Sequence, residues 1–427
     1  MKILLVISVV LVMCTAANAG ADDRSLEERV RALELQIQAL RSYDAVRDAT
    51  IRQIIVDVLD DADRRSAFLQ QSLTAGWDKG FFLASADDSF RMVMRGHMQA
   101  QWTVNHQRGE GSSDRWRSGF ENRRTRVGFR GHVIDPRLTF DIYTEFDRSD
   151  EGSLGVITAL IGYEFADGWT VSTGKFKPPY LREALMSSTR LLAVDRSLVH
   201  QSLKQGRAQG VELEHQGDWL RWQVAVHDGF DTNTSPALMR DTELPGLTSR
   251  IELLFNLEGD RSWRQFRDFT SDPDDDVAIM IGVAGHIERD EFGTTDRDED
   301  TLFAWTFDAS LEGHGLTLFA AAIGQHDDQR DVVAAVLQGG VRITEDVELF
   351  ARYEWGDEDE PSGEDLSIAT AGVTWFIDGE RIKAVADIGY GLNQVTDFWA
   401  SSGAGWRSDA ADEDGQIVLR TQLQLTW

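Results

Sequence analysis

The sequence is poor in cysteine, proline and positive charge, and each shortage narrows the class of protein it can encode. Its 427 residues include one cysteine and seven prolines, so disulfides cannot hold the fold together. The 72 Asp and Glu outnumber the 43 Lys and Arg, and this balance argues against a nucleic-acid partner. After residue 20 no apolar run reaches the roughly 20 residues that a transmembrane helix needs. A polytopic helical membrane protein is excluded. A membrane β-barrel is not, because only alternate residues of its strands need be apolar.

Residues 1–19 are predicted to be a secretory signal peptide. Lys2 supplies the positive start, residues 3–13 are apolar, and Ala17-Asn18-Ala19 fits the small-x-small cleavage pattern. An uncleaved anchor helix is the alternative, but the apolar stretch is short for it. The mature chain is therefore expected to be exported.

Residues 20–75 are predicted to be an α-helical coiled coil. Ser25 and Glu28 form a capping box, and neither Gly nor Pro occurs from Ser25 to about Leu73. Apolar side chains then recur at alternating spacings of four and three, at Leu26, Val30, Leu33, Ile37 and Leu40. Because the other faces are polar, such a seam needs partner helices and predicts an oligomer. A surface helix on a globular domain is the alternative.

From Phe90 onward the hydrophobic period changes to two, which predicts strands with one apolar and one polar face. In residues 90–105 nearly every even position is apolar and most odd positions are polar. We count about sixteen such segments, with approximate spans 90–106, 120–133, 137–148, 153–165, 169–177, 206–216, 219–229, 246–258, 277–288, 301–312, 315–327, 331–343, 346–356, 364–377, 381–394 and 415–427.

The lengths of these segments and of their connections favour a membrane barrel. Many segments exceed the five or six residues usual in soluble strands and reach the 9–11 or so that a tilted membrane strand needs. Short turns alternate with longer acidic loops, and Trp and Tyr lie near segment ends, as in outer-membrane barrels. Gly259–Asp276 departs from this alternation, so either it carries a small helix or the strand count slips there. Residues 76–427 are thus predicted to be an all-β transmembrane barrel of about 16 antiparallel strands; a large soluble β-protein is the alternative.

Residues from about Gly76 to Asn233 resemble the phosphate-selective porin O and P family of Gram-negative outer membranes. Four stretches carry the resemblance in order: 80–85 (GFFLAS), 123–131 (RRTRVGFRG), 174–179 (GKFKPP) and 207–213 (RAQGVEL). The resemblance implies a sixteen-stranded barrel in the lipid bilayer of the outer membrane, a homotrimer, and passive diffusion of small anionic solutes such as phosphate. It also implies a third loop that folds into the barrel, and it places the N-terminal coil in the periplasm.

A barrel of this size leaves an aqueous channel, whose selectivity depends on the lumen face and on inward loops. The first two strands carry candidate anion-attracting arginines on their polar faces: Arg91, Arg95, Arg124, Arg126 and Arg130. Arg123 has the opposite parity and needs a bulge or an end position to reach the pore. The third long connection, Pro178–Gln205, is the candidate constriction loop, and its cations are Arg182, Arg190, Arg196 and Lys204. Guanidinium groups suit phosphate and carboxylate because they donate two hydrogen bonds in a fixed fork.

Two alternatives to an anion-preferring pore remain open. The same parity turns acids inward, so the arginines can instead balance them in an unselective or cation-selective porin; these acids are Asp141, Glu145, Asp147, Glu212, Glu252, Asp308, Glu348 and Asp387. The second alternative is a structural tether, in which the coil contacts the cell wall and the barrel is its anchor. We expect no enzyme, cofactor or metal site, because the sequence shows no supported Ser/His/Asp set and no Cys/His metal spacing.

Overall fold

The computed structural model describes residues 31–32, 34–39, 52–53, 56–58, 73–78, 80–107, 115–146, 153–230, 244–289, 301–327, 330–359, 365–408 and 414–427. Contacts divide the chain after residue 72, and the barrel lies in the unit Leu73–Trp427. The described residues before this unit are helical and exposed, as the sequence predicts, while the coiled coil itself remains a prediction. The predicted signal peptide lies outside the described residues. In the described chain no helix is both long and apolar enough to span a membrane.

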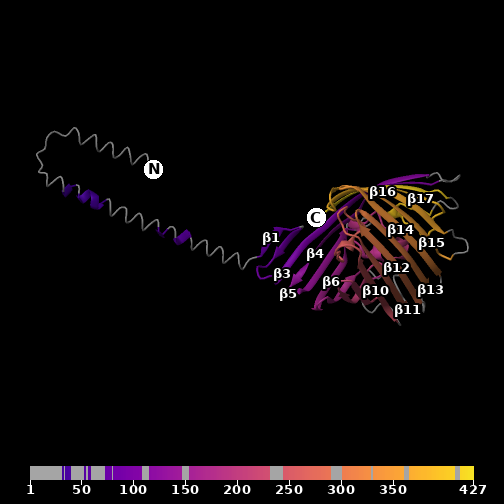
Figure 1. Ribbon diagram of the computed structural model, residues 1–427, viewed down its shortest axis with the longest axis horizontal. Coiled ribbons are helices and arrows are strands. Elements are labelled where there is room, and N and C mark those ends of the chain that lie inside the picture. The colour runs from indigo at the N-terminus through magenta and orange to yellow at the C-terminus, as the bar shows by residue number, and fades with distance from the viewer. Residues whose placement is uncertain are drawn as a thin grey trace, which may run out of the picture. The chain divides into compact units, whose positions relative to one another are not determined.

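Sixteen antiparallel strands of the described chain, β3 to β18, close into a barrel (Figure 1). Each pairs with the next, and β18 returns to β3 through pairs from Ile417↔His106 to Thr426↔His97. All sixteen predicted segments correspond to these strands, and the largest difference is the start of β4, at Trp116 instead of residue 120. The strands are β3 (Phe90–His106), β4 (Trp116–Val133), β5 (Asp135–Phe146), β6 (Leu154–Ala166), β7 (Trp169–Phe176), β8 (Ala208–Gln216), β9 (Leu220–His227), β10 (Leu244–Asn256), β11 (Ala278–Arg289), β12 (Thr301–Gly313), β13 (Leu316–Asp327), β14 (Arg330–Thr344), β15 (Val347–Asp357), β16 (Leu366–Asp378), β17 (Ile382–Gly391) and β18 (Ile417–Thr426).

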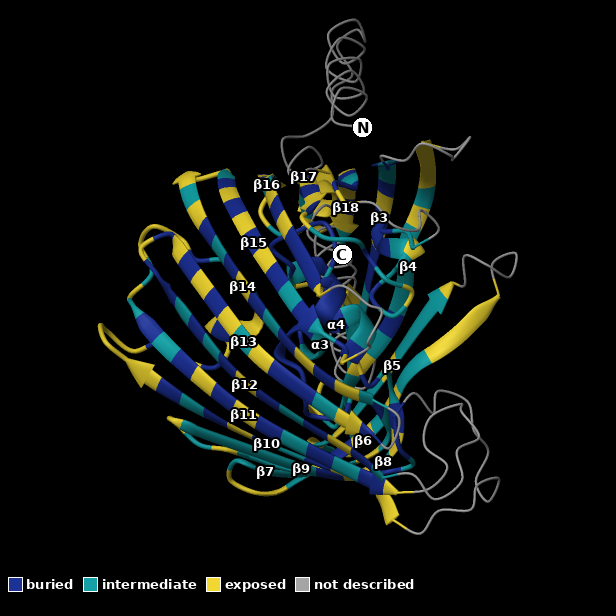
Figure 2. Cartoon of the chain, turned by 90° about the vertical axis from the view of Figure 1, so that its right-hand side faces the viewer, coloured by how far each residue is buried: buried dark blue, intermediate teal, exposed yellow. Residues whose placement is uncertain are grey.

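Side chains alternate between the two faces of the barrel wall, with the apolar face outward. Phe307 is 54% exposed, whereas its neighbour Asp308 is 4% exposed. Figure 2 shows the same alternation of buried and exposed residues along β11 to β16. An exposed apolar exterior around a charged interior is the reverse of a soluble protein, and it is the arrangement that lipid around the barrel requires.

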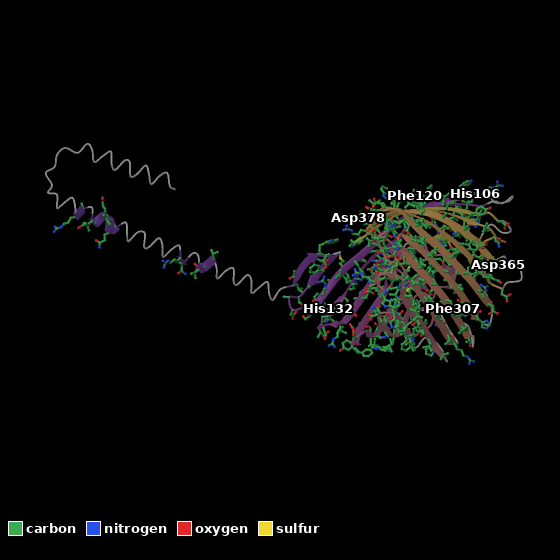
Figure 3. All side chains as sticks on the ribbon, in the orientation of Figure 1. His106, Phe120, His132, Phe307, Asp365 and Asp378 are labelled. Carbon is green, nitrogen blue, oxygen red and sulfur yellow. The ribbon has the colours of Figure 1, made fainter. Side chains whose placement is uncertain are left out.

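The two ends of the barrel differ in their connections. At the short-turn end, single residues or short turns join the strands, and the barrel both begins, at Phe90, and ends, at Trp427. Figure 3 places His132 and Asp378 toward this short-turn end, and His106 and Asp365 toward the opposite, long-loop end.

The connection between β10 and β11 is the exception at the short-turn end. It contains the 3-10 helix η2 (Gln265–Arg267), and its apolar side chains Phe266 and Phe269 are 2% and 3% exposed. The first alternative offered by the sequence, a small helix, is therefore correct, and the strand count does not slip.

A short hairpin that the sequence pattern did not predict precedes the barrel. Its strands are β1 (Thr74–Trp77) and β2 (Phe81–Ala84), and β2 pairs with residues 91–93 of β3. The hairpin therefore extends the wall beyond the end of β18, whose last residue, Trp427, exchanges backbone hydrogen bonds with Gly96. Strands of four residues are too short for a period of two to be recognised.

Two connections of the long-loop end fold into the barrel and fill part of it. Residues 177–207 contain α3 (Arg182–Leu185), η1 (Ser188–Arg190) and α4 (Leu198–Leu203), and Figure 2 shows α3 and α4 within the barrel. Residues 392–408 of the second connection contain η3 (Ser402–Ala404). Both segments contribute to one buried apolar cluster with inward residues of β11 to β18. The loop predicted to fold inward thus does so, and it covers one side of the lumen.

The segment 392–408 packs against the inner wall through tryptophan rings that lie on glycines. Trp399 is fully buried, and a Cβ atom added to Gly356 of β15 would lie 2.6 Å from its ring. The wall must therefore lack a side chain at this position for the segment to pack against it.

We predict that Gly356→Ala displaces Trp399 and lowers the free energy of unfolding by about 1–3 kcal/mol, as overpacking of a closed core does. Guanidinium unfolding in detergent micelles, followed by tryptophan fluorescence, measures the change. Gly119→Ala is the matched control, because a Cβ there meets nothing within 4 Å. Equal stability of the two variants would contradict the proposed seat.

Candidate functional site

Inward-facing charges on the strands β10 to β18 form buried ion pairs. The guanidinium of Arg250 lies 2.8 Å from Asp308, and that of Arg420 lies 2.7 Å from Asp387. None of these four side chains is more than 1% exposed. Arg250 also donates to the carbonyl of Tyr180 in the inward loop, at 2.8 Å. These pairs attach the loop to the wall, and their burial removes them from contact with a passing solute.

The opposite side of the lumen, along β3 to β9, holds two cavities with basic linings. The cavity toward the long-loop end measures about 460 Å³, and Glu145 is the single acid among its described lining residues. The cavity toward the short-turn end measures about 900 Å³ and has no Asp or Glu side chain in its described lining. The cations of the long-loop cavity are Arg123, Arg124, Arg126, Lys177, Arg196, Lys204 and Arg207. Those of the short-turn cavity are Arg95, Arg130, Arg182, Arg190, Arg221, Arg267 and Arg381.

A β-bulge in β4 turns two consecutive arginines toward the inward loop. Gln99 pairs with Arg124 but Ala100 pairs with Asn122, so Arg123 is the extra residue. Arg123 and Arg124 both reach the carboxylate of Asp195, at 2.6 and 2.8 Å. The condition that the sequence set for Arg123, a bulge, is met.

Asp195 is charged in the folded protein although its side chain is completely buried. Burial raises the pKa of this carboxyl, but the guanidiniums of Arg124 and Arg123 overcome burial and hold the pKa well below 3.8. A lowered pKa stabilises the fold at every pH above 3.8, and the contribution is lost only as the pH falls through the lower folded value. We call Asp195 with Arg123 and Arg124 the latch. Its ion pairs therefore persist at neutral pH.

We predict that Asp195→Asn lowers the free energy of unfolding by about 3–5 kcal/mol, because it leaves two buried guanidiniums without their counter-charge. Equilibrium unfolding in detergent micelles measures this loss. The matched control is Asp135→Asn, which removes an exposed partner of Arg137 and should leave stability unchanged. A latch variant as stable as the control would show that the loop is held by its apolar contacts alone.

The arginines predicted on the first two strands do not form a continuous row of unpaired positive charges. Arg95 is paired with Asp141 and lies over the ring of Tyr143, and Arg126 lies 3.0 Å from Glu145. Two acids that parity turned inward thus neutralise two of the predicted arginines. The third arginine of this group, Arg130, is exposed to the lumen and has no ion pair in the described part of the chain.

Arg91 and Arg124, the remaining strand arginines, each have an acidic partner. Arg91 is at the rim of the short-turn end, 3.6 Å from Asp78 and over the ring of Phe82 in the β1–β2 hairpin. Arg124 is 5% exposed within the latch. Its burial removes Arg124 from direct contact with a diffusing anion.

Two cations of the constriction loop have a structural position. Arg182 is buried and donates to the backbone carbonyl of Phe266, which joins the loop to the β10–β11 connection. Arg196 donates to the carbonyls of Glu183 and Met186, at 2.7 and 2.8 Å. These guanidiniums maintain the shape of the loop while part of each lines a cavity.

The other two loop cations are more accessible. Arg190 lies 2.9 Å from Asp268 of the β10–β11 connection, with 38% of its side chain exposed. The ammonium of Lys204 lies 3.5 Å from the side-chain oxygen of Gln201 on the exposed side of α4. Arg190 faces the short-turn cavity and Lys204 the long-loop cavity.

A contact between loop and wall separates the two cavities. Ser188 Oγ lies 3.3 Å from His97 Nε2 and 3.4 Å from a guanidinium nitrogen of Arg126. The hydroxyl of Tyr143 lies 2.8 Å from the other nitrogen of His97. His97 lines the short-turn cavity and Arg126 the long-loop cavity, so a solute that crosses between them passes these polar side chains.

Five cations that line these cavities were not given a role from the sequence. Lys177 and Arg207 stand within two stretches that carry the family resemblance, and their basic character was the available signal. Arg221 is on a strand whose parity indicated an inward side chain. Arg267 belongs to the β10–β11 connection, whose course the sequence did not reveal. Arg381 is in the short turn between β16 and β17.

No group of three or more His, Cys, Asp or Glu in the described chain is arranged to hold a metal ion. Residues 272–276 form an acidic run in the β10–β11 connection. There the carboxylate of Asp275 accepts hydrogen bonds from Ser271 and from the backbone of Asp272.

Residues 95–306 match the family model of phosphate-selective porin O and P. This part of the chain belongs to that family. The match begins in β3 and ends in β12, so it includes the bulge, the inward loop and the β10–β11 connection. Family and fold together indicate an outer-membrane channel rather than an enzyme. Among curated proteins, no sequence relative matches the chain.

Solved structures of outer-membrane proteins share the fold at low sequence identity. OmpF of Salmonella typhi in complex with daunomycin has a TM-score of 0.54 and 12% identity over 82% of this chain and 100% of its own. The anion-selective porin from Comamonas acidovorans has a TM-score of 0.53 and 11% identity over 79% and 99%. OmpT of Vibrio cholerae has a TM-score of 0.53 and 14% identity over 80% and 98%. Identities this low show a common barrel fold and carry no detail of the pore.

Proposed function

We propose that this porin conducts small hydrophilic solutes by passive diffusion and prefers anions such as phosphate. The observation that carries the proposal is the lining of the two cavities, in which cations greatly outnumber acids among the described residues. A cleft lined by one sign of charge raises the local concentration of the opposite ion. One of the neighbouring structures is, by its title, an anion-selective porin, which agrees with this proposal.

The negative net charge of the chain, −29, does not contradict an anion-preferring pore. Charges more than about 8–10 Å from the path are largely screened at physiological ionic strength. Most of the described acids that the strand parity turns inward are paired with arginines, as Asp308 and Asp387 are. The charges that a solute meets at close range are therefore those of Arg130, of the accessible loop cations, and of Arg126 with its partner Glu145.

The basic side chains along the path are suited to phosphate and carboxylate oxygens. A guanidinium donates hydrogen bonds in a fork that matches these anions, while a lysine acts as a point charge. Moderate exposure in a wet lumen keeps each contact weak enough for release, which conduction requires.

We also propose a homotrimer whose N-terminal coil lies in the periplasm. The heptad seam of residues 26–40 needs partner helices, and one neighbouring structure is titled a trimer form of Vibrio cholerae OmpT. Short turns face the periplasm in outer-membrane barrels, and the barrel unit of this chain begins at its short-turn end.

Contact of the coil with the cell wall is the second candidate role, in which the barrel is an anchor. Planar-bilayer recordings distinguish the roles, because a closed anchor gives no ion steps.

We predict that Arg126→Gln with Arg130→Gln lowers the anion-to-cation permeability ratio at least about threefold. A unit charge about 5 Å from an ion in water contributes roughly 0.8 kcal/mol, and two such charges are lost. The reversal potential of the full-length protein in a salt gradient measures the ratio. Arg137→Gln is the control, since Arg137 is at the same end of the barrel as Arg130 but outside both cavity linings.

Two outcomes would overturn the proposal. A reversal potential of cation-selective sign in the unaltered protein would show that the inward acids dominate. An unchanged ratio in the double variant would remove Arg126 and Arg130 from the selectivity mechanism.

A further inference from the structure

The side chain of Tyr143 crosses the inner face of β4. Tyr143 belongs to β5 and pairs directly with Gly128 of β4. Its hydroxyl nevertheless lies 2.8 Å from Nδ1 of His97 in β3, which is the next strand beyond β4. Neighbouring strands lie about 4.8 Å apart, so the ring must pass over β4 to reach His97. Gly128 permits this crossing, because a Cβ atom at that position would overlap the ring of Tyr143.

A guanidinium holds the ring of Tyr143 in this position. The guanidinium carbon of Arg95 lies 4.5 Å from the ring centroid, and Arg95 is paired with Asp141, two residues before Tyr143 on β5. A guanidinium over an aromatic face is attracted by the quadrupole of the ring. The ring is therefore fixed by the backbone of β4, by Arg95 and, through its hydroxyl, by His97.

His97 connects this ring to the inward loop. Its Nε2 lies 3.3 Å from Oγ of Ser188. The loop is fixed to the wall at this point by two amide side chains, because Gln99 donates to the carbonyl of Ser188 at 2.9 Å and Gln424 donates to that of the next residue at 3.1 Å. Tyr143, His97 and Ser188 thus form a continuous row from the wall to the loop, which we call the crossbar.

The boundary between the two cavities coincides with the crossbar. On β5, Tyr143 lines the short-turn cavity, whereas Glu145, two residues farther along, lines the long-loop cavity. The cross-strand partners His97 and Arg126 are divided between the cavities in the same way. A solute that moves from one cavity to the other must therefore pass the crossbar.

We propose that Tyr143 determines the largest solute that can pass between the two cavities. It is the crossbar residue that a solute meets, since His97 and Ser188 are 2% and 3% exposed whereas Tyr143 is half-buried. A phenol is uncharged at neutral pH, so this limit acts on the size of a solute and is separate from the preference for anions. The inference rests on the proposed channel function, because a size limit requires that solutes cross the lumen.

Exclusion of neutral polymers from the pore measures this size limit. Single channels of the full-length protein are recorded in potassium chloride with polyethylene glycols of increasing mass, and the largest polymer that still lowers the conductance defines the limit. Tyr143→Ala should raise the conductance without polymer at least about 1.5-fold and should admit larger polymers, because pore diameter limits passage. Tyr143→Phe keeps a ring over Gly128 and should retain the limit of the unaltered protein.

Two further variants make the result specific to the crossbar. Tyr143→Leu keeps an apolar side chain over Gly128 but cannot reach His97, so it should admit polymers of intermediate size; it also replaces the alanine variant if that variant does not fold. Tyr163→Ala is the matched control, because it removes a tyrosine of β6 that is 38% exposed and lies outside both cavity linings. It should change neither the conductance nor the limit.

The contrary outcomes are separable. An unchanged limit in folded Tyr143→Ala and Tyr143→Leu overturns the assignment of Tyr143, and so does an equal increase in Tyr163→Ala. A phenylalanine variant as permissive as the alanine variant overturns the role of Gly128 and Arg95 in holding the ring. A channel of cation-selective sign overturns the anion preference alone, since neutral polymers report the limit in either case. A protein that gives no ion steps defeats the proposed function and this inference with it.

Discussion

The contact of Asp195 with Arg123 and Arg124 determines where the lumen of this barrel is open. It joins the inward loop to β4. A separate apolar cluster holds the same loop against β11 to β18. A buried carboxylate between two guanidiniums has a large desolvation penalty, which only close geometry on both sides repays. The loop is consequently fixed to β4 as well as to β11 to β18, and the space left for solute lies along the basic strands at the start of the barrel.

That division of the lumen also explains how an acidic protein presents a basic path. On the loop-covered side several inward acids have a buried arginine as partner, as Asp387 has in Arg420 and Asp308 has in Arg250. On the other side the acids neutralise some arginines, such as Arg126 with Glu145, but leave Arg130 and Arg267 in excess. Selectivity in such a channel depends on which charges are within reach of the solute rather than on their sum over the chain.

The strands could be predicted from the sequence because the bilayer imposes the period of two on every one of them. The interior could not be predicted to the same degree. Phe120 and Arg124 are both even positions of β4, yet Phe120 is 86% exposed outside and Arg124 is buried inside, because the bulge at Arg123 inverts the parity. Parity assigned a side to each residue correctly only between such irregularities. It also gave no partner for the loop cations Arg182 and Arg196, which are bound by backbone carbonyls rather than by acids.

The length of the β10–β11 connection was not enough to predict its course inside the barrel. Its length identified it as unusual for the short-turn end, and a small helix was one of two explanations. Its inward course follows from Trp263, Phe266 and Phe269, which have no lipid face to cover at the barrel end and bury their rings inside. In this connection the aromatic residues at every third position, Trp263, Phe266 and Phe269, are the ones that hold it in the lumen. The polar residues between those aromatics then become lumen residues, which is how Arg267 reaches the path of the solute.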